Sequence, residues 1–76
     1  MRRVVFSEEA KSSIRAIPRH IAMNILTAVH RFAEHGAGDI KQLKGASGEK
    51  RLRVGDYRVR LTEEPLGALT IHTVPP

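Results

Sequence analysis

The feature that most constrains this chain is an alternation of apolar and basic residues on both sides of Gly55-Asp56. A period of two residues predicts β-strands, here over residues 49 to 54 and 57 to 62. Gly-Asp is a two-residue connection typical of a tight hairpin turn, because Gly readily adopts positive φ. The segment therefore predicts an antiparallel β-hairpin.

The turn also fixes which residues of the two strands face each other. With Gly55 and Asp56 as the loop, Arg53 lies opposite Arg58, and Arg51 lies opposite Arg60. Successive side chains of a strand point to opposite faces, so these four arginines share one face of the sheet. The other face holds the apolar residues Leu52, Val54, Tyr57, Val59 and Leu61.

Two amphipathic helices are expected before the hairpin. The first follows Ser7, a typical N-cap residue, and ends before Pro18, which disfavours helical geometry in the residue that precedes it. The second runs from Arg19 to about His35, with one apolar stripe along its length and glycines after it. The second helix is the longest element that the sequence predicts.

Two short β-prone runs lie near the chain ends, at residues 3 to 6 and 69 to 74, whereas the Gly-rich residues 36 to 48 are expected to form a loop. The predicted order is β-α-α-β-β-β. Helices followed by strands without β-α alternation indicate an α+β fold, with two N-terminal helices packed on one face of a mostly antiparallel four-stranded sheet. A chain of 76 residues has room for one domain, which we expect to span residues 1 to 76.

The positive charge is concentrated in and just before the hairpin. Residues 41 to 60 hold seven basic and two acidic residues, an excess equal to the net charge of +5 of the whole chain. Opposed like charges disfavour strand pairing by about 0.2 to 1 kcal/mol, so folding does not require four arginines on one face. Arginine forks suit phosphate oxygens and also stack on bases. We interpret this face as an anion site, with a solvated sheet surface as the alternative; RNA, DNA and an acidic protein remain open as partners.

His72 is a further candidate on the same face. If Leu69 and Ile71 face the core, alternation places His72 with the arginines, and histidine is the side chain whose ordinary pKa lies near neutrality. It is therefore a candidate general acid or base, although a strand histidine is more often a plain surface residue.

The sequence predicts neither a metal nor a cofactor. It has no Cys, its other histidines do not share a helical face, and it contains no phosphate-loop or dinucleotide motif. No apolar run approaches the roughly 18 residues needed to cross a bilayer, so we expect no membrane association. The absence of Cys fits a reducing cytoplasm, where we expect the protein to act.

Two segments carry a resemblance to a known family: Gln42-Leu43-Lys44-Gly45, and the stretch from Arg51 to Val59 that reads R-L-R-V-G-D-Y-R-V. After two helices and a short strand, they resemble the RelE/ParE superfamily of bacterial toxin-antitoxin modules over nearly the whole chain. RelE-like members are mRNA endonucleases of the ribosomal A site, ParE-like members inhibit DNA gyrase, and a cognate antitoxin neutralises both. The resemblance implies a RelE-like toxin with ribosome and mRNA as partners, or alternatively a gyrase inhibitor.

The resemblance also suggests site residues. The basic residues around the turn hold mRNA phosphates in the family and stabilise charge while the ribose 2′-OH attacks the phosphorus. We therefore assign catalytic roles to Arg51, Arg53, Arg58 and, from its place on the sheet, His72. RNA-binding roles are assigned to Lys41, Lys44, Lys50 and Arg60. RelE-like enzymes supply another Arg, and usually a Tyr, just after the last strand, where this sequence has Val74-Pro75-Pro76. We therefore expect impaired catalysis, with a toxin that only binds antitoxin as a further alternative.

Overall fold

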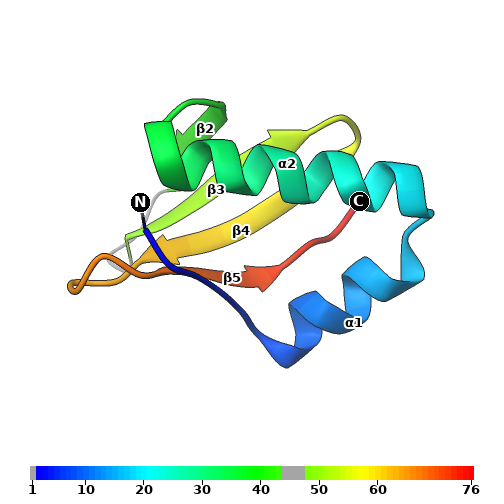
Figure 1. Cartoon of the computed structure of the whole chain (residues 1–76), viewed down its shortest axis with the longest axis horizontal. Coiled ribbons are helices and arrows are strands. Elements are labelled where there is room, and N and C mark those ends of the chain that lie inside the picture. Colours follow the sequence, from blue (N-terminus) through cyan, green and yellow to red (C-terminus); the bar gives the residue numbers. More distant parts are fainter. Residues whose placement is uncertain (1, 44–47) are drawn as a thin grey trace.

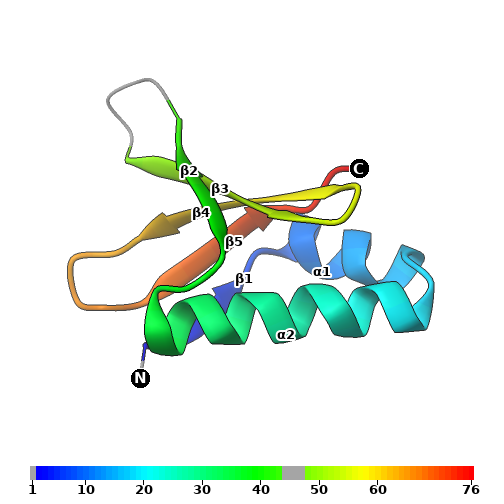
Figure 2. The ribbon, with the colours of Figure 1, turned by 90° about the horizontal axis from the view of Figure 1, so that it is seen from above.

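Both helices lie on the same side of a twisted sheet (Figures 1 and 2). The computed structural model describes residues 2 to 43 and 48 to 76. Within these residues the elements are β1 (Val4–Phe6), α1 (Glu8–Ala16), α2 (Arg19–His35), β2 (Asp39–Gln42), β3 (Glu49–Val54), β4 (Tyr57–Glu63) and β5 (Leu69–Thr73). The strands form one sheet in the order β1-β5-β4-β3-β2. The β1–β5 pair is parallel and the other pairs are antiparallel, which confirms the α+β class.

The helices begin and end at the residues that the sequence indicated. The Ser7 hydroxyl accepts a hydrogen bond from the Ala10 backbone N–H at 3.0 Å and so caps α1. After Pro18, α2 runs to Gly36, which adopts a left-handed φ of 68° and closes the helix. The apolar stripes of both helices face the sheet.

The core lies between the helices and the apolar face of the sheet. Ile25 and Val29 of α2 are fully buried against strand residues such as Val59 and Leu61 of the hairpin. β5 contributes two more fully buried side chains, Leu69 and Ile71, on the side where α1 packs. No helix in the described part of the chain is long and apolar enough to span a membrane.

The sheet has one strand more than the sequence predicted. We expected residues 36 to 48 to be a loop, but Asp39–Gln42 form the edge strand β2, antiparallel to β3. Ile40 lies opposite Leu52 and packs against the core. Gly38 permits this close approach, since a Cβ at that position would lie 2.8 Å from Leu52 Cδ1. The pairing partner β3, rather than any long local alternation, makes this segment a strand.

A cluster around Arg2 ties the end of α2 to the sheet. The Arg2 guanidinium donates to the carbonyl oxygens of Phe32 at 2.9 Å and Ala33 at 3.3 Å, and it lies 5.0 Å from the centre of the Phe32 ring. It also forms an ion pair with Glu63, which in turn pairs with Lys50. The hydrogen bond from Lys50, together with the charges of Lys50 and Arg2, holds the pKa of Glu63 below its ordinary value.

Candidate nucleic-acid interface

The face of the sheet away from the helices carries the four hairpin arginines. Arg53 pairs with Arg58 and Arg51 pairs with Arg60, which confirms the register predicted from the Gly55-Asp56 turn. Arg53, Arg58 and Arg60 are exposed, and Arg51 is half-buried. We call Arg51, Arg53, Arg58 and Arg60 the arginine face. Neither helix covers it, because both pack on the opposite side of the sheet (Figure 2).

Three of these arginines surround a small hollow at the hairpin turn. The hollow has a volume of about 210 Å³ and is lined by Arg51, Arg53, Gly55, Asp56 and Arg58. Its lining residues come from both strands and from the turn between them. Among the described residues, Arg53 and Arg58 have no ion-pair partner. A site of this kind suits a phosphate group, which accepts several hydrogen bonds from guanidinium forks.

The neighbouring strand β2 adds one charge of each sign to this face. Lys41 lies opposite Arg51 and extends the positive surface, as expected, while Asp39 lies opposite Arg53. Glu49 lies two residues before Arg51 and forms an ion pair with Arg60 at 3.4 Å. Neither carboxylate was among the residues expected on this face. The alternation of β3 already places Glu49 on this face, whereas Asp39 joins it only through the pairing of β2 with β3.

One of the lysines assigned to RNA binding, Lys50, does not lie on the arginine face. Lys50 lies opposite Leu61, on the helix side of the sheet, and its ammonium group is paired with Glu63. The alternation of side chains along β3 already predicts this position, because Lys50 lies two residues before the buried Leu52 and so shares its face of the sheet. Lys44 falls outside the described residues.

His72 lies on the same face, beyond the arginine pairs. The register between β4 and β5 shifts at Arg60 and Leu61, which pair with Thr73 and Ile71. His72 is therefore the extra residue of a β-bulge. Its Nε2 lies 2.8 Å from Oγ1 of Thr62, which has the same parity as Arg60. The structure thus brings His72 to the arginine side of the sheet, in a half-buried position.

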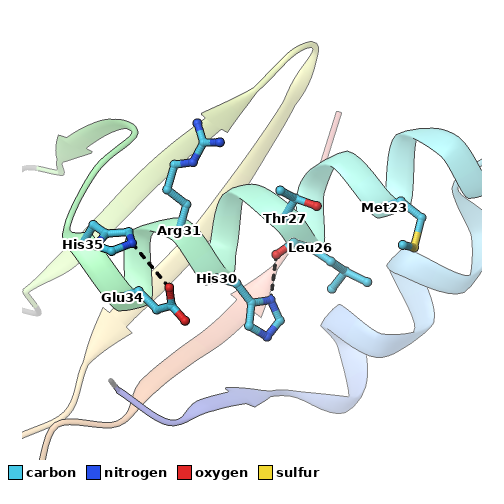
Figure 3. Close-up of a pocket in the computed structure, with 7 residues that line it drawn as sticks. All are labelled: Met23, Leu26, Thr27, His30, Arg31, Glu34 and His35. Atoms are coloured by element: carbon cyan, nitrogen blue, oxygen red, sulfur yellow. Dashed lines mark hydrogen bonds and ion pairs between the residues drawn. The ribbon is translucent and has the colours of Figure 1, made fainter.

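Other clusters of polar side chains offer less chemistry. In the described part of the chain, no group of three or more His, Asp or Glu residues could hold a metal ion. A larger and more open depression, of about 530 Å³, follows the outer surface of α2 (Figure 3). There the His30 ring bonds to the Leu26 carbonyl oxygen, and His35 lies 3.4 Å from the Glu34 carboxylate. These contacts stay within one helix and do not converge on a common point.

Comparison with known proteins identifies the fold. No protein-family model matches the sequence, and no curated protein matches it. Solved structures do match. A chain of the intact E. coli RelBE toxin-antitoxin complex has a TM-score of 0.85 at 13% identity, with 99% of this chain and 95% of that chain covered. The archaeal RelE-RelB complex from Pyrococcus horikoshii gives 0.83 at 20% identity, covering 99% and 93%. The YoeB dimer from Staphylococcus aureus gives 0.78 at 17% identity, covering 97% and 94%.

Proposed function

We propose that this chain, which has the fold of the RelE toxins, is the toxin of a toxin-antitoxin module and cleaves mRNA on the ribosome. The proposal includes a cognate antitoxin as partner, a single functional domain over residues 1 to 76 and a cytoplasmic site of action. The likeness to chains of solved RelE-RelB and RelBE complexes supports the toxin role and the antitoxin partner. RNA cleavage rests on the residues of the sheet.

The observation that carries this function is the arginine face. Four guanidinium groups stand on two paired strands, with arginines directly opposite one another, at a net cost to strand pairing. A ligand with closely spaced negative charges would offset this repulsion, and an RNA backbone has one phosphate per nucleotide. The exposed arginines would therefore hold successive phosphates, and Lys41 would lengthen the track. Stacking of bases on guanidinium planes would add sequence-tolerant binding.

The same groups suit cleavage by internal attack. The ribose 2′-oxygen forms a bond to the adjacent phosphorus, and the bond from phosphorus to the 5′-oxygen breaks. Arg51, Arg53 and Arg58 would stabilise the negative charge that develops on the phosphoryl oxygens. They do not exchange protons at ordinary pH, so His72 is proposed to take the proton of the 2′-OH, while water protonates the leaving 5′-oxygen.

Purified protein added to a translating ribosome mixture tests the proposal. We expect mRNA cleavage that depends on ribosomes, seen as new 5′ ends by primer extension, and loss of protein synthesis. The double variant Arg51→Gln, Arg58→Gln should abolish cleavage. The double variant Lys11→Gln, Arg15→Gln removes the same charge from α1, on the other side of the sheet, and should retain cleavage.

Other outcomes lead to different functions. Intact mRNA with continued translation would refute the RNA-cleaving function. If DNA gyrase supercoiling is blocked instead, the protein is a gyrase inhibitor. If RNA is uncut and gyrase is unaffected, but an antitoxin copurifies with the chain, a protein that only binds antitoxin is the remaining function.

A further inference from the structure

His72 is held at both its backbone and its ring. The Ser7 hydroxyl, which caps α1, donates to the His72 carbonyl oxygen at 2.6 Å. On the ring side, Nε2 lies 2.8 Å from Thr62 Oγ1. Thr62 Oγ1 lies 3.1 Å from the Glu64 carboxylate. A residue at a β-bulge is thus anchored from α1 on one side and from β4 on the other, although a bulge leaves it without a regular partner in the ladder.

The direction of each hydrogen bond between Glu64, Thr62 and His72 follows from the chemistry of Glu64 and Thr62. An ionised carboxylate only accepts hydrogen bonds, so the single hydroxyl proton of Thr62 is donated to Glu64. The Thr62 oxygen then has only lone pairs to offer to His72. The 2.8 Å contact therefore requires a proton on Nε2, which donates to Thr62. In neutral His72 this leaves Nδ1 as the nitrogen without a proton.

We propose that Thr62 and Glu64 are positioning residues that hold neutral His72 in the Nε2–H tautomer and leave Nδ1 as its proton-accepting atom. Nδ1 makes no hydrogen bond to any residue that the structure describes, and it is not sealed from solvent. The arginines of this face cannot accept a proton, whereas an unprotonated Nδ1 can. That Nδ1 acts on the 2′-OH of RNA rests on the proposed function; the tautomer itself does not.

NMR of the isolated, ¹⁵N-labelled protein tests the tautomer directly. Long-range ¹H–¹⁵N correlation spectra distinguish a protonated from an unprotonated ring nitrogen, and a His72→Gln variant identifies the signals among those of four histidines. At a pH where the ring is neutral, wild-type protein should show a protonated Nε2 and an unprotonated Nδ1. A proton on Nδ1 would overturn the inference without any variant.

Three variants test the role of the side chains. Thr62→Val removes the hydroxyl and keeps the shape, so the two ring nitrogens should shift toward an average of both tautomers. Thr62→Ser should restore the wild-type shifts. Thr70→Val is the matched control, because Thr70 pairs with Thr62 across the strands and is equally half-buried, and it should change nothing. If Thr62→Val leaves the His72 shifts unchanged, or shifts them no more than Thr70→Val does, the inference is wrong.

Cleavage assays separate this inference from the proposed function. If RNA is the substrate, His72→Gln should lower kcat by about 10²- to 10⁴-fold, and Thr62→Val by part of that factor, each with KM unchanged. If wild-type protein cuts no RNA, the proposed function fails while the NMR result still decides the tautomer. If RNA is cut and Thr62→Val keeps both kcat and the His72 shifts, the function stands and the positioning role is refuted.

Discussion

Replacing Arg58 by Thr should make the protein more stable and its RNA binding weaker. Arg58 lies directly opposite Arg53, is exposed, and has no ion-pair partner among the described residues. A like-charged cross-strand pair opposes folding by about 0.2 to 1 kcal/mol, and Thr is well suited to strands. For a domain of this size, removing that repulsion raises the melting temperature by roughly 1 to 8 °C.

The effect on binding follows from the release of counterions. Each phosphate neutralised on single-stranded nucleic acid contributes about −0.7 to the slope of log K against log salt concentration. Four arginines that all contact phosphates give a slope of about −2.8, and Arg58→Thr should reduce its magnitude by about 0.7. Fluorescence anisotropy with labelled polyuridine RNA over a salt series measures the slope, and thermal unfolding followed by circular dichroism measures the stability.

Two further variants control for the loss of charge itself. Arg31→Gln removes one exposed charge from α2, on the helix side of the sheet, and should leave the salt slope unchanged. Arg60→Thr should reduce the slope as Arg58→Thr does but gain less stability, because Arg60 also loses its ion pair with Glu49. A less stable Arg58→Thr protein, or one with the wild-type salt slope, would refute the reasoning.

Three other predictions concern stability. Arg2→Met should lower the free energy of unfolding by about 1 to 3 kcal/mol in urea titrations, because Arg2 bonds two helix carbonyls and Glu63. Arg3→Met, at an exposed position, should change the free energy of unfolding little. Equal losses in the two variants would contradict the role of Arg2. Because folding lowers the pKa of Glu63, the stability that its carboxylate contributes is complete above the ordinary value of 4.5. This stability is lost as the pH falls through the lower folded-state value. Glu63→Gln should therefore be less stable than wild type at neutral pH, with the gap closing below pH 4.5 in thermal melts; a gap that persists in acid would argue against the ion pairs. Gly38→Ala should cost more stability than Gly67→Ala in the same melts. Both glycines have positive φ, but only at Gly38 would the new Cβ meet Leu52. Similar losses would show that backbone strain alone determines the cost of each substitution.

The hairpin and the helices were predictable because their signals are local. A two-residue turn and the period of the flanking strands determine the pairing of Arg53 with Arg58 without reference to the rest of the chain. Ser7 and Pro18 likewise mark the bounds of α1 through interactions within a few residues. The position of the arginines on one face of the sheet followed from these local facts alone.

The remaining features depend on contacts between distant segments. β2 is a strand because it pairs with β3, and this pairing brings Asp39 beside Arg53. The bulge at His72 lies just after Ile71, the last residue of β5 that pairs with β1, and no sequence window shows it. Lys50 is a different case. Its place in the strand already put it on the same face as Leu52, but its positive charge led us to assign it to RNA binding. The contact between Thr62 and His72 joins residues ten positions apart and required the bulge to be known.

The strand order also determines when this protein can fold during its synthesis. β5 lies between β1 and β4, and β1 reaches the sheet only through its parallel pairing with β5, with Val4 opposite Leu69. A nascent chain that ends before residue 69 has an N-terminal strand without a partner and lacks two fully buried core residues. Such long-range pairing is formed late in folding because the loop must close first. The arginine face would therefore be presented on a rigid sheet only after residues 69 to 73 have been made.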